Sequence, residues 1–237
     1  MSWSISDNDM RQLNNNGDTR QVEFCAYCGK TTQTRDHVPS RVLLDEPFPE
    51  NLPVVPACLH CNNIASFDEE YLACLVECVI CGTTDSAKVS REKICRVLDK
   101  QHALQEQLTA ALRWKNEQAL FNIELDRVER IVVKLAQGHA LYELNEPQFA
   151  KPSSVVISPL HLLSSEVQED FENSSRHGSA IYPEVGSRAM QRLVQNEHGW
   201  IEVQRSRYRY LATTDAVVRV RLVLSEYLAC EVIWSKL

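Results

Sequence analysis

The chain has 237 residues, of which 44% are hydrophobic and 24% charged, and its formal net charge is −7 at pH 7. This composition is typical of a globular protein with one sizeable core, or with a small module attached to a larger one. The acidic balance does not favour nucleic-acid binding, although a local basic surface is compatible with it. The polar N-terminus lacks the apolar stretch of a signal peptide, and no apolar run approaches the roughly 18–20 residues that span a bilayer. We therefore expect a cytoplasmic protein without membrane association.

Four segments follow one another along the chain. Residues 1–20 are rich in Asn, Asp and Ser and predict a flexible tail. Residues 21–83 contain two Cys-x-x-Cys pairs, and the prolines between residues 39 and 56 exclude one long helix there. We expect short strands and loops in this segment, a helical region over 84–150, and a C-terminal α+β region with an antiparallel sheet over 151–237. The predicted fold class is α+β.

Helical patterns dominate the middle of the chain. Acidic residues from Asp68 onward favour the start of a helix. Ser90 is the predicted N-cap of a second helix, whose apolar residues recur at helical spacing through the stretch up to Gln118. A third helical pattern begins at Leu120 and is predicted to end at Gly138, because glycine is a common C-terminal cap.

The C-terminal stretch alternates apolar and polar residues and predicts three strands joined by short turns. Alternation places five arginines on one face of this sheet, opposite an apolar face. These are Arg205, Arg207, Arg209, Arg219 and Arg221. Such a face is able to bind phosphates, but a solvated face paired with Glu202 and other acids explains the pattern equally well. Both interpretations stay open at this point.

Nine cysteines in a reducing compartment suggest metal or core positions before disulfides. Two Cys-x-x-Cys pairs, formed by Cys25, Cys28, Cys58 and Cys61, enclose the proline-rich loop. Each pair can present two thiolates from a tight turn, so together they predict a tetrahedral, structural zinc site. The remaining cysteines are predicted to be buried core residues, with three of them on one face of a helix, and Cys78 and Cys81 are an alternative metal-binding pair. These are Cys74, Cys78, Cys81, Cys95 and Cys230.

Between the two pairs lies an adjacent acid and imidazole, Asp36 and His37, in the stretch "DHVPS". Hydrolysis of a phosphodiester needs a base for water and a cation for the charge that builds on phosphorus. With "CAYC" before this stretch and "ENLPVVPACLHCN" after it, the sequence resembles the HNH family of ββα-metal endonucleases, in the subgroup braced by two Cys-x-x-Cys pairs. The resemblance covers roughly residues 22–70.

The resemblance implies a role for each matching residue. Asp36 and Asn62 would bind a catalytic Mg²⁺ or Mn²⁺, since both offer hard oxygen ligands. His37 would be the general base, and Asn51 would be the middle residue of the motif, fixing the loop and the orientation of His37. The implied fold of this segment is a zinc-braced ββα-metal finger. The implied reaction is hydrolysis of DNA to 5′-phosphate and 3′-hydroxyl ends.

The sequence departs from the family in one position and leaves one choice open. Ala65 stands where many relatives carry a lysine, and Asn63 competes with Asn62 as the metal ligand. The implied partner is DNA, with an ATPase or other effector subunit and a homo-oligomer as further options, in a setting of microbial defence or mobile elements. The alternative from another class is a non-catalytic zinc-finger adaptor that binds nucleic acid or a protein.

Overall fold

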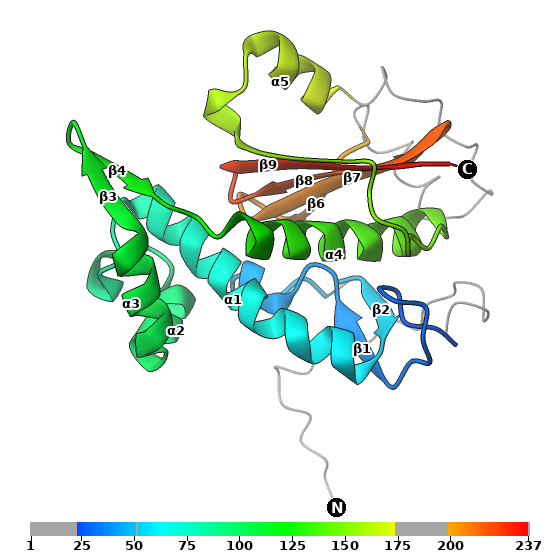
Figure 1. The fold of residues 1–237 in the computed structure, drawn as a ribbon, viewed down its shortest axis with the longest axis horizontal. Helices are drawn as coiled ribbons and strands as arrows, with labels where there is room; N and C mark the ends of the chain where they lie inside the picture. The colour runs from blue at the N-terminus through cyan, green and yellow to red at the C-terminus, as the bar shows by residue number, and fades with distance from the viewer. Residues whose placement is uncertain (1–22, 51, 174–198, 237) are drawn as a thin grey trace, which may run out of the picture.

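The computed structural model describes residues 23–50, 52–173 and 199–236 (Figure 1). Their fold is mixed α+β, as the sequence predicts. Five α-helices are α1 (Leu59–Cys81), α2 (Glu92–Lys100), α3 (His102–Ala111), α4 (Leu125–Leu144) and α5 (Ser165–Glu172). The strands are β1 (Thr34–His37), β2 (Val54–Ala57), β3 (Leu112–Lys115), β4 (Gln118–Phe121), β5 (Ser154–Pro159), β6 (Ile201–Gln204), β7 (Tyr208–Thr214), β8 (Val217–Leu224) and β9 (Leu228–Ser235). Short 3-10 helices are η2 (Arg41–Leu43), η3 (Ser86–Lys88) and η4 (Leu160–Leu162).

The N-terminal part runs from an antiparallel pair of strands into a long helix. β1 pairs with β2, and α1 begins two residues after β2 ends. The predicted start of this helix near Asp68 is wrong, because α1 already begins at Leu59. The Cys58 side chain caps the helix by accepting a hydrogen bond from the Cys61 amide, so the second cysteine pair forms the first turn.

The second predicted helix is interrupted. α2 follows Arg91, which makes no side-chain capping bond, so Ser90 as the N-cap is wrong. The helix breaks at Gln101, and the stretch after α3 forms the hairpin β3–β4 instead of continuing as helix. Asn116 and Glu117 both take positive φ at the hairpin tip, a backbone conformation that matches the twist of paired strands. Helical spacing did not reveal this turn.

Helix α4 lies between the N-terminal part and the large sheet (Figure 1). The predicted helix is wrong at both ends, because Leu120 lies in strand β4 and α4 runs from Leu125 to Leu144, where Asn145 caps it in the left-handed region. Gly138 lies inside α4 and packs against Val38, the residue that follows β1. A Cβ on Gly138 would lie 2.7 Å from a methyl carbon of Val38. The glycine therefore serves close packing rather than capping.

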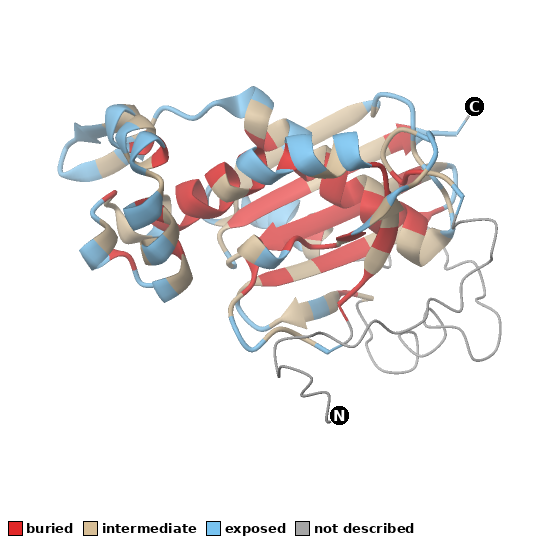
Figure 2. Cartoon of the chain, turned by 90° about the horizontal axis from the view of Figure 1, so that it is seen from below, coloured by how far each residue is buried: buried red, intermediate tan, exposed pale blue. Residues whose placement is uncertain are grey.

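The C-terminal sheet has five antiparallel strands in the order β5-β9-β8-β7-β6. The prediction of three strands is wrong, since the terminal stretch forms four and β5, which precedes it in the chain, adds an edge strand beside β9. Tyr208, Tyr210 and Val220 lie in the main core under α4, whereas Leu211 and Val223 pack with Phe171 of α5 in a second cluster. Figure 2 shows the burial that results along the strands.

One hydrophobic core joins the three segments predicted after the N-terminal tail. It includes Val38 beside β1, Leu98 of α2 and Val220 of β8, with α4 contributing several residues between them. Among the described residues, no helix is both long and apolar enough to cross a membrane. α4 thus connects the N-terminal cysteine region to the sheet through continuous packing.

Candidate metal centre and functional site

The sulfur atoms of Cys25, Cys28, Cys58 and Cys61 all lie within 4.8 Å of one another. Cys28 Sγ and Cys58 Sγ are 3.7 Å apart. Four thiolates at about 2.3 Å from a tetrahedral zinc ion would be separated by about 3.8 Å, so the cluster has suitable dimensions. The predicted grouping of the two pairs is confirmed, and these residues could hold a metal ion such as zinc.

Backbone hydrogen bonds position the first pair against the second. The Cys25 amide donates to the Lys30 carbonyl over 2.7 Å, and Gly29 takes a φ of +72° in the turn between them. The Ala26 amide donates to the Pro56 carbonyl of β2 over 2.8 Å. The first pair is therefore fixed to the strand that leads directly into Cys58.

The thiols of the cluster differ in acidity. The amide of Cys61 donates to the Cys58 sulfur and lowers the Cys58 pKa to about 7, while burial raises the pKa of Cys25. Elsewhere, burial raises the pKa values of Cys74 and Cys78 to about 12. Among the described residues, the cluster of four is the only group of three or more His, Cys, Asp and Glu side chains close enough together to hold a metal ion. Cys74, Cys78 and Cys230 are buried, as predicted, whereas Cys81 and Cys95 are only partly buried.

Asp36 lies on β1 with its carboxylate turned into a polar interior and 8% exposed. Its Oδ2 atom accepts a hydrogen bond from the Tyr27 hydroxyl over 2.7 Å and lies 2.5 Å from Nζ of Lys134 on α4. No described residue donates to Oδ1, and this oxygen is not among the buried atoms that lack a partner. Oδ2 of Asp36 is thus held by Tyr27 and Lys134, whereas Oδ1 is available to a ligand.

Lys134 also lies 2.5 Å from Oε1 of Glu69 on α1. The second oxygen of Glu69 accepts from the Ser40 hydroxyl over 2.9 Å. Lys134 and Glu69 are both 7% exposed. Burial acts to lower the Lys134 pKa, but the charges of Asp36 and Glu69 outweigh burial and raise it. The two carboxylates therefore share one buried ammonium.

His37 ends β1 beside Asp36. A guanidinium nitrogen of Arg41 lies 3.2 Å from its Nε2 atom. Because a guanidinium only donates, Nε2 is an acceptor and the ring proton resides on Nδ1. Nδ1 is buried and has no partner among the described residues. Burial and the charge of Arg41 lower the His37 pKa, so the ring is neutral at pH 7 and able to accept a proton.

Asn62 lies in the first turn of α1 and points at β1. Its Nδ2 atom donates to Thr34 Oγ1 over 2.9 Å and to the Arg35 carbonyl over 3.5 Å, which leaves its carbonyl oxygen without a described donor. Asn63 is exposed. Asn51 lies outside the described residues, so its predicted role has no structural counterpart here.

The predicted arginine face is not assembled as expected. Arg205 and Arg207 lie in the turn between β6 and β7 rather than on a strand. Arg207 lies 2.5 Å from Asp45, and Arg209 pairs with Glu172 at 2.7 Å. These pairs correspond to the salt-bridged alternative.

On the neighbouring strand β8, the remaining two arginines are also occupied. Arg219 and Arg221 both pair with Glu231, at 2.8 and 2.6 Å. Arg221 is 1% exposed and donates to the carbonyls of Asp170 and Phe171 at the end of α5. Arg209, Arg219 and Arg221 share one sheet face, as alternation predicts, but each pairs with a carboxylate. Arg205 and Arg207 lie off the strand, so the five do not form an open row of cations.

Sequence reasoning missed the groups that surround Asp36 and His37. Lys134 lies 65 residues from Glu69, and no local spacing connects it to either carboxylate. Arg41 follows His37 by four residues, and this closeness in sequence was the only signal for its contact with Nε2. Tyr27, between the first two cysteines, offered no signal for its bond to Asp36.

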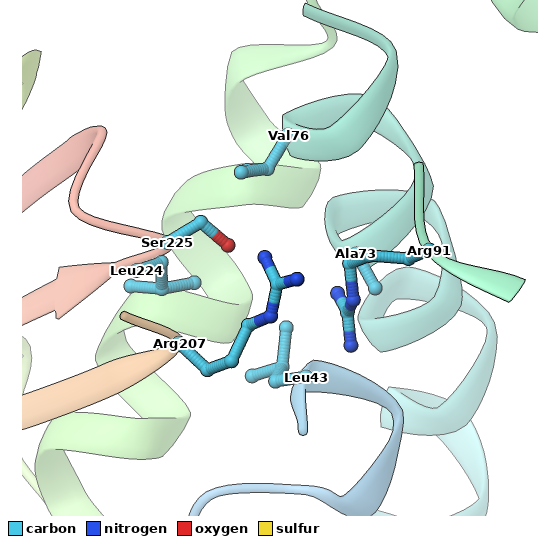
Figure 3. A pocket seen from close by; sticks show the side chains of 7 residues that line it. All are labelled: Leu43, Ala73, Val76, Arg91, Arg207, Leu224 and Ser225. Atoms are coloured by element: carbon cyan, nitrogen blue, oxygen red, sulfur yellow. The ribbon is translucent and has the colours of Figure 1, made fainter. Parts of the chain in front are cut away.

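A small cavity lies between η2, α1 and the turns at one end of the sheet (Figure 3). Its volume of about 10 Å³ accommodates roughly one water molecule. Figure 3 shows the guanidinium groups of Arg91 and Arg207 facing one another in it, and Asp45 binds both at 2.7 and 2.5 Å. This cavity is a structural junction, too small for a substrate.

Comparison of the chain with known protein families, curated proteins and solved structures gives no match.

Proposed function

We propose that the protein is a metal-dependent endonuclease of the HNH type that hydrolyses phosphodiester bonds in DNA. The observation that supports this most strongly is the grouping of an acid, a neutral imidazole and an amide beside a four-cysteine cluster. Asp36 and His37 end the first strand, and Asn62 lies in the first turn of the helix that follows the second strand. In this proposal β1, β2 and α1 form the ββα-metal finger, and the cysteines hold a structural zinc.

The two oxygen ligands fit a hard divalent cation. Asp36 Oδ1 and the carbonyl oxygen of Asn62 have no described donors, and their neighbouring atoms are fixed by hydrogen bonds. Such oxygens suit Mg²⁺ or Mn²⁺. The cation, when bound, offsets the charge that develops on the phosphoryl oxygens and on the leaving oxygen. The implied ligands come from β1 and α1, which the cysteine cluster joins.

His37 supplies the base in the proposed reaction. Nε2 accepts a proton from water after Arg41 moves off it, and the water oxygen forms a bond to phosphorus. The bond between phosphorus and the 3′ oxygen breaks, and that oxygen takes a proton from solvent. The products carry 5′-phosphate and 3′-hydroxyl ends. Arg41 would then be free to approach the phosphate that it cannot reach while it contacts Nε2.

The proposal is tested by incubating the purified full chain with supercoiled plasmid and Mn²⁺ or Mg²⁺. We expect nicking that EDTA stops. His37→Ala should reduce the rate by about 10²–10⁴, because it removes only the general base, while zinc content and melting temperature stay as in the wild type. A variant that retains most of the wild-type rate would exclude His37 as the base.

One observation favours the alternative of a non-catalytic adaptor. The Asp36 carboxylate already has the Lys134 ammonium as a counter-ion, which reduces its attraction for a divalent metal. An adaptor would contain zinc and bind DNA or a protein, but it would leave plasmid intact at every metal concentration. The same cleavage assay, combined with a mobility-shift measurement, therefore separates the two functions.

A further inference from the structure

We propose that Lys134 is a positioning residue of the metal site, which holds Asp36 through one carboxylate oxygen and presents the other to the metal. This inference rests on the proposed function and deepens it. It assigns to α4, outside the ββα segment, a direct part in the geometry of the site.

The contacts of α4 with the first strand are specific. Lys134 and Gly138 are four residues apart, so they share one face of the helix. Lys134 contacts Asp36, and Gly138 leaves room for the side chain of Val38, which follows Asp36 by two residues. The same face of α4 therefore contacts Asp36 and Val38, the residues that precede and follow His37 in the sequence. Any displacement of α4 would shift the acid and the base together.

Two donors converge on the same oxygen of Asp36. Tyr27 and Lys134 both bind Oδ2, whereas no described residue donates to Oδ1. A carboxylate held in this way cannot rotate to offer both oxygens to one cation. Asp36 is thereby restricted to binding a metal through a single oxygen, in one orientation.

Glu69 holds the other side of the ammonium. It binds Lys134 at 2.5 Å and is itself held by Ser40. The trio of Asp36, Glu69 and Lys134 carries one net negative charge rather than two. The ammonium also repels a divalent cation at Oδ1, so this arrangement aligns the ligand at a cost in metal affinity.

The decisive variant removes the ammonium and keeps the net charge of the trio. Lys134→Met with Glu69→Gln leaves Asp36 as the one charged member, so no pair of buried carboxylates remains unneutralised. Glu69→Gln alone is the matched control, because it retains the contact between Lys134 and Asp36. Mn²⁺ binding is measured by electron paramagnetic resonance of free Mn²⁺, melting by circular dichroism, and cleavage with plasmid at saturating Mn²⁺.

We expect the double variant to bind Mn²⁺ several-fold to about tenfold more tightly, because the repulsion is lost. Its cleavage rate at saturating Mn²⁺ should fall by about tenfold or more, because Asp36 can rotate and bind with both oxygens. The control retains the contact between Lys134 and Asp36, so its rate should fall less than that of the double variant. Opposite changes in affinity and rate are not expected from a residue that only stabilises the fold.

Tyr27→Phe provides a second test that does not disturb the buried charges. It removes the other donor to Oδ2 and should change Mn²⁺ affinity and rate in the same directions, by smaller factors. Folded variants with wild-type Mn²⁺ affinity and wild-type rate would overturn the role of Lys134. A wild-type chain that neither binds Mn²⁺ at this site nor cleaves plasmid would instead overturn the proposed function.

Discussion

The contact between Gly138 and Val38 shows how a single missing side chain positions the candidate site. Val38 is 1% exposed and directly follows His37, and its methyl carbons would lie 2.7 and 2.9 Å from a Cβ on Gly138. Distances under 3 Å require one of the two elements to shift. The space around Val38 therefore controls how closely the end of β1 approaches α4.

Gly138→Ala overpacks a filled core, which should cost about 1–3 kcal/mol in the free energy of unfolding. The gain in helix propensity from alanine, about 1 kcal/mol, offsets part of this cost, so the net loss of stability should reach up to about 2 kcal/mol. Thermal melting of the purified variant provides the measurement. Plasmid cleavage should fall as well, since the displaced Val38 neighbours His37.

Val38→Ala in the Gly138→Ala background is the matched control. It removes the two methyl carbons that the new side chain meets, and the remaining contact to the Val38 Cβ is 3.3 Å. The double variant should recover stability relative to the sum of the two single changes. Additive losses would show that the two residues are not coupled.

At the scale of secondary-structure elements, the cysteine cluster connects a turn, a strand and a helix start. Cys58 caps α1, and Cys61 belongs to its first turn. A bound metal would therefore couple folding of the first pair to formation of the helix. The proposed site at Asp36 and Asn62 lies on the neighbouring strand β1 and on the same first turn of α1, but its ligands would be oxygen atoms rather than sulfur atoms.

Cys58→Ser should release the metal of the cluster and unfold the N-terminal part. Asp36→Ala should retain the zinc content of the wild type and lose cleavage, although its melting temperature will fall because Lys134 loses a partner. Elemental analysis of both purified variants decides between the two sites. Equal loss of zinc in both would contradict two separate metal sites.

Asp45 connects two further elements, because it binds Arg91 before α2 and Arg207 before β7. Burial acts to raise the Asp45 pKa, but both arginines outweigh burial and lower it. A carboxyl with a lowered folded pKa stabilises the protein above its unfolded pKa of about 3.9, and this contribution disappears as pH falls through the folded value.

Asp45→Asn should therefore destabilise the protein at pH 7 by about 1 kcal/mol, which corresponds to about 2–4 °C in melting temperature. The difference between variant and wild type should shrink as the pH falls below about 4. Melting curves between pH 7 and pH 2.5 test this. A difference that stays constant over the whole range would show that the charge of Asp45 does not contribute.

At the scale of the whole molecule, the distribution of charge limits where DNA would bind. The outer face of the sheet carries arginines that are neutralised by acids and covered by α5. Phosphate binding needs cations that are accessible and not already paired. Lys30 is exposed near the cysteine cluster, which makes this end of the molecule the better candidate surface.

Arg209→Gln with Arg219→Gln should lower the melting temperature and leave the salt dependence of DNA binding unchanged. Lys30→Gln is the comparison, and we expect it to reduce the slope of log affinity against log salt by roughly 0.9. Fluorescence anisotropy with a duplex at several salt concentrations measures both. A reduced slope in the arginine variant would restore the sheet as a DNA-binding surface.

Several features of this protein were determined by local sequence. Each Cys-x-x-Cys pair places two sulfurs in one turn, so the cluster depended on few long-range contacts beyond the pairing of β1 with β2. Alternation of apolar residues predicted strands near the C-terminus, and helical spacing predicted much of α4. The adjacency of Asp36 and His37 is likewise a property of the chain itself.

Tertiary structure alone decided the partners of these residues. Lys134 reaches Asp36, Arg209 reaches Glu172, and Gly138 lies against Val38 only after α4 and α5 pack on their neighbours. Residue spacing carries no information about which distant side chain will meet a buried charge. The sequence does not distinguish a glycine that permits close packing from one that caps a helix. The distinction depends on whether atoms of another helix or strand lie against that glycine.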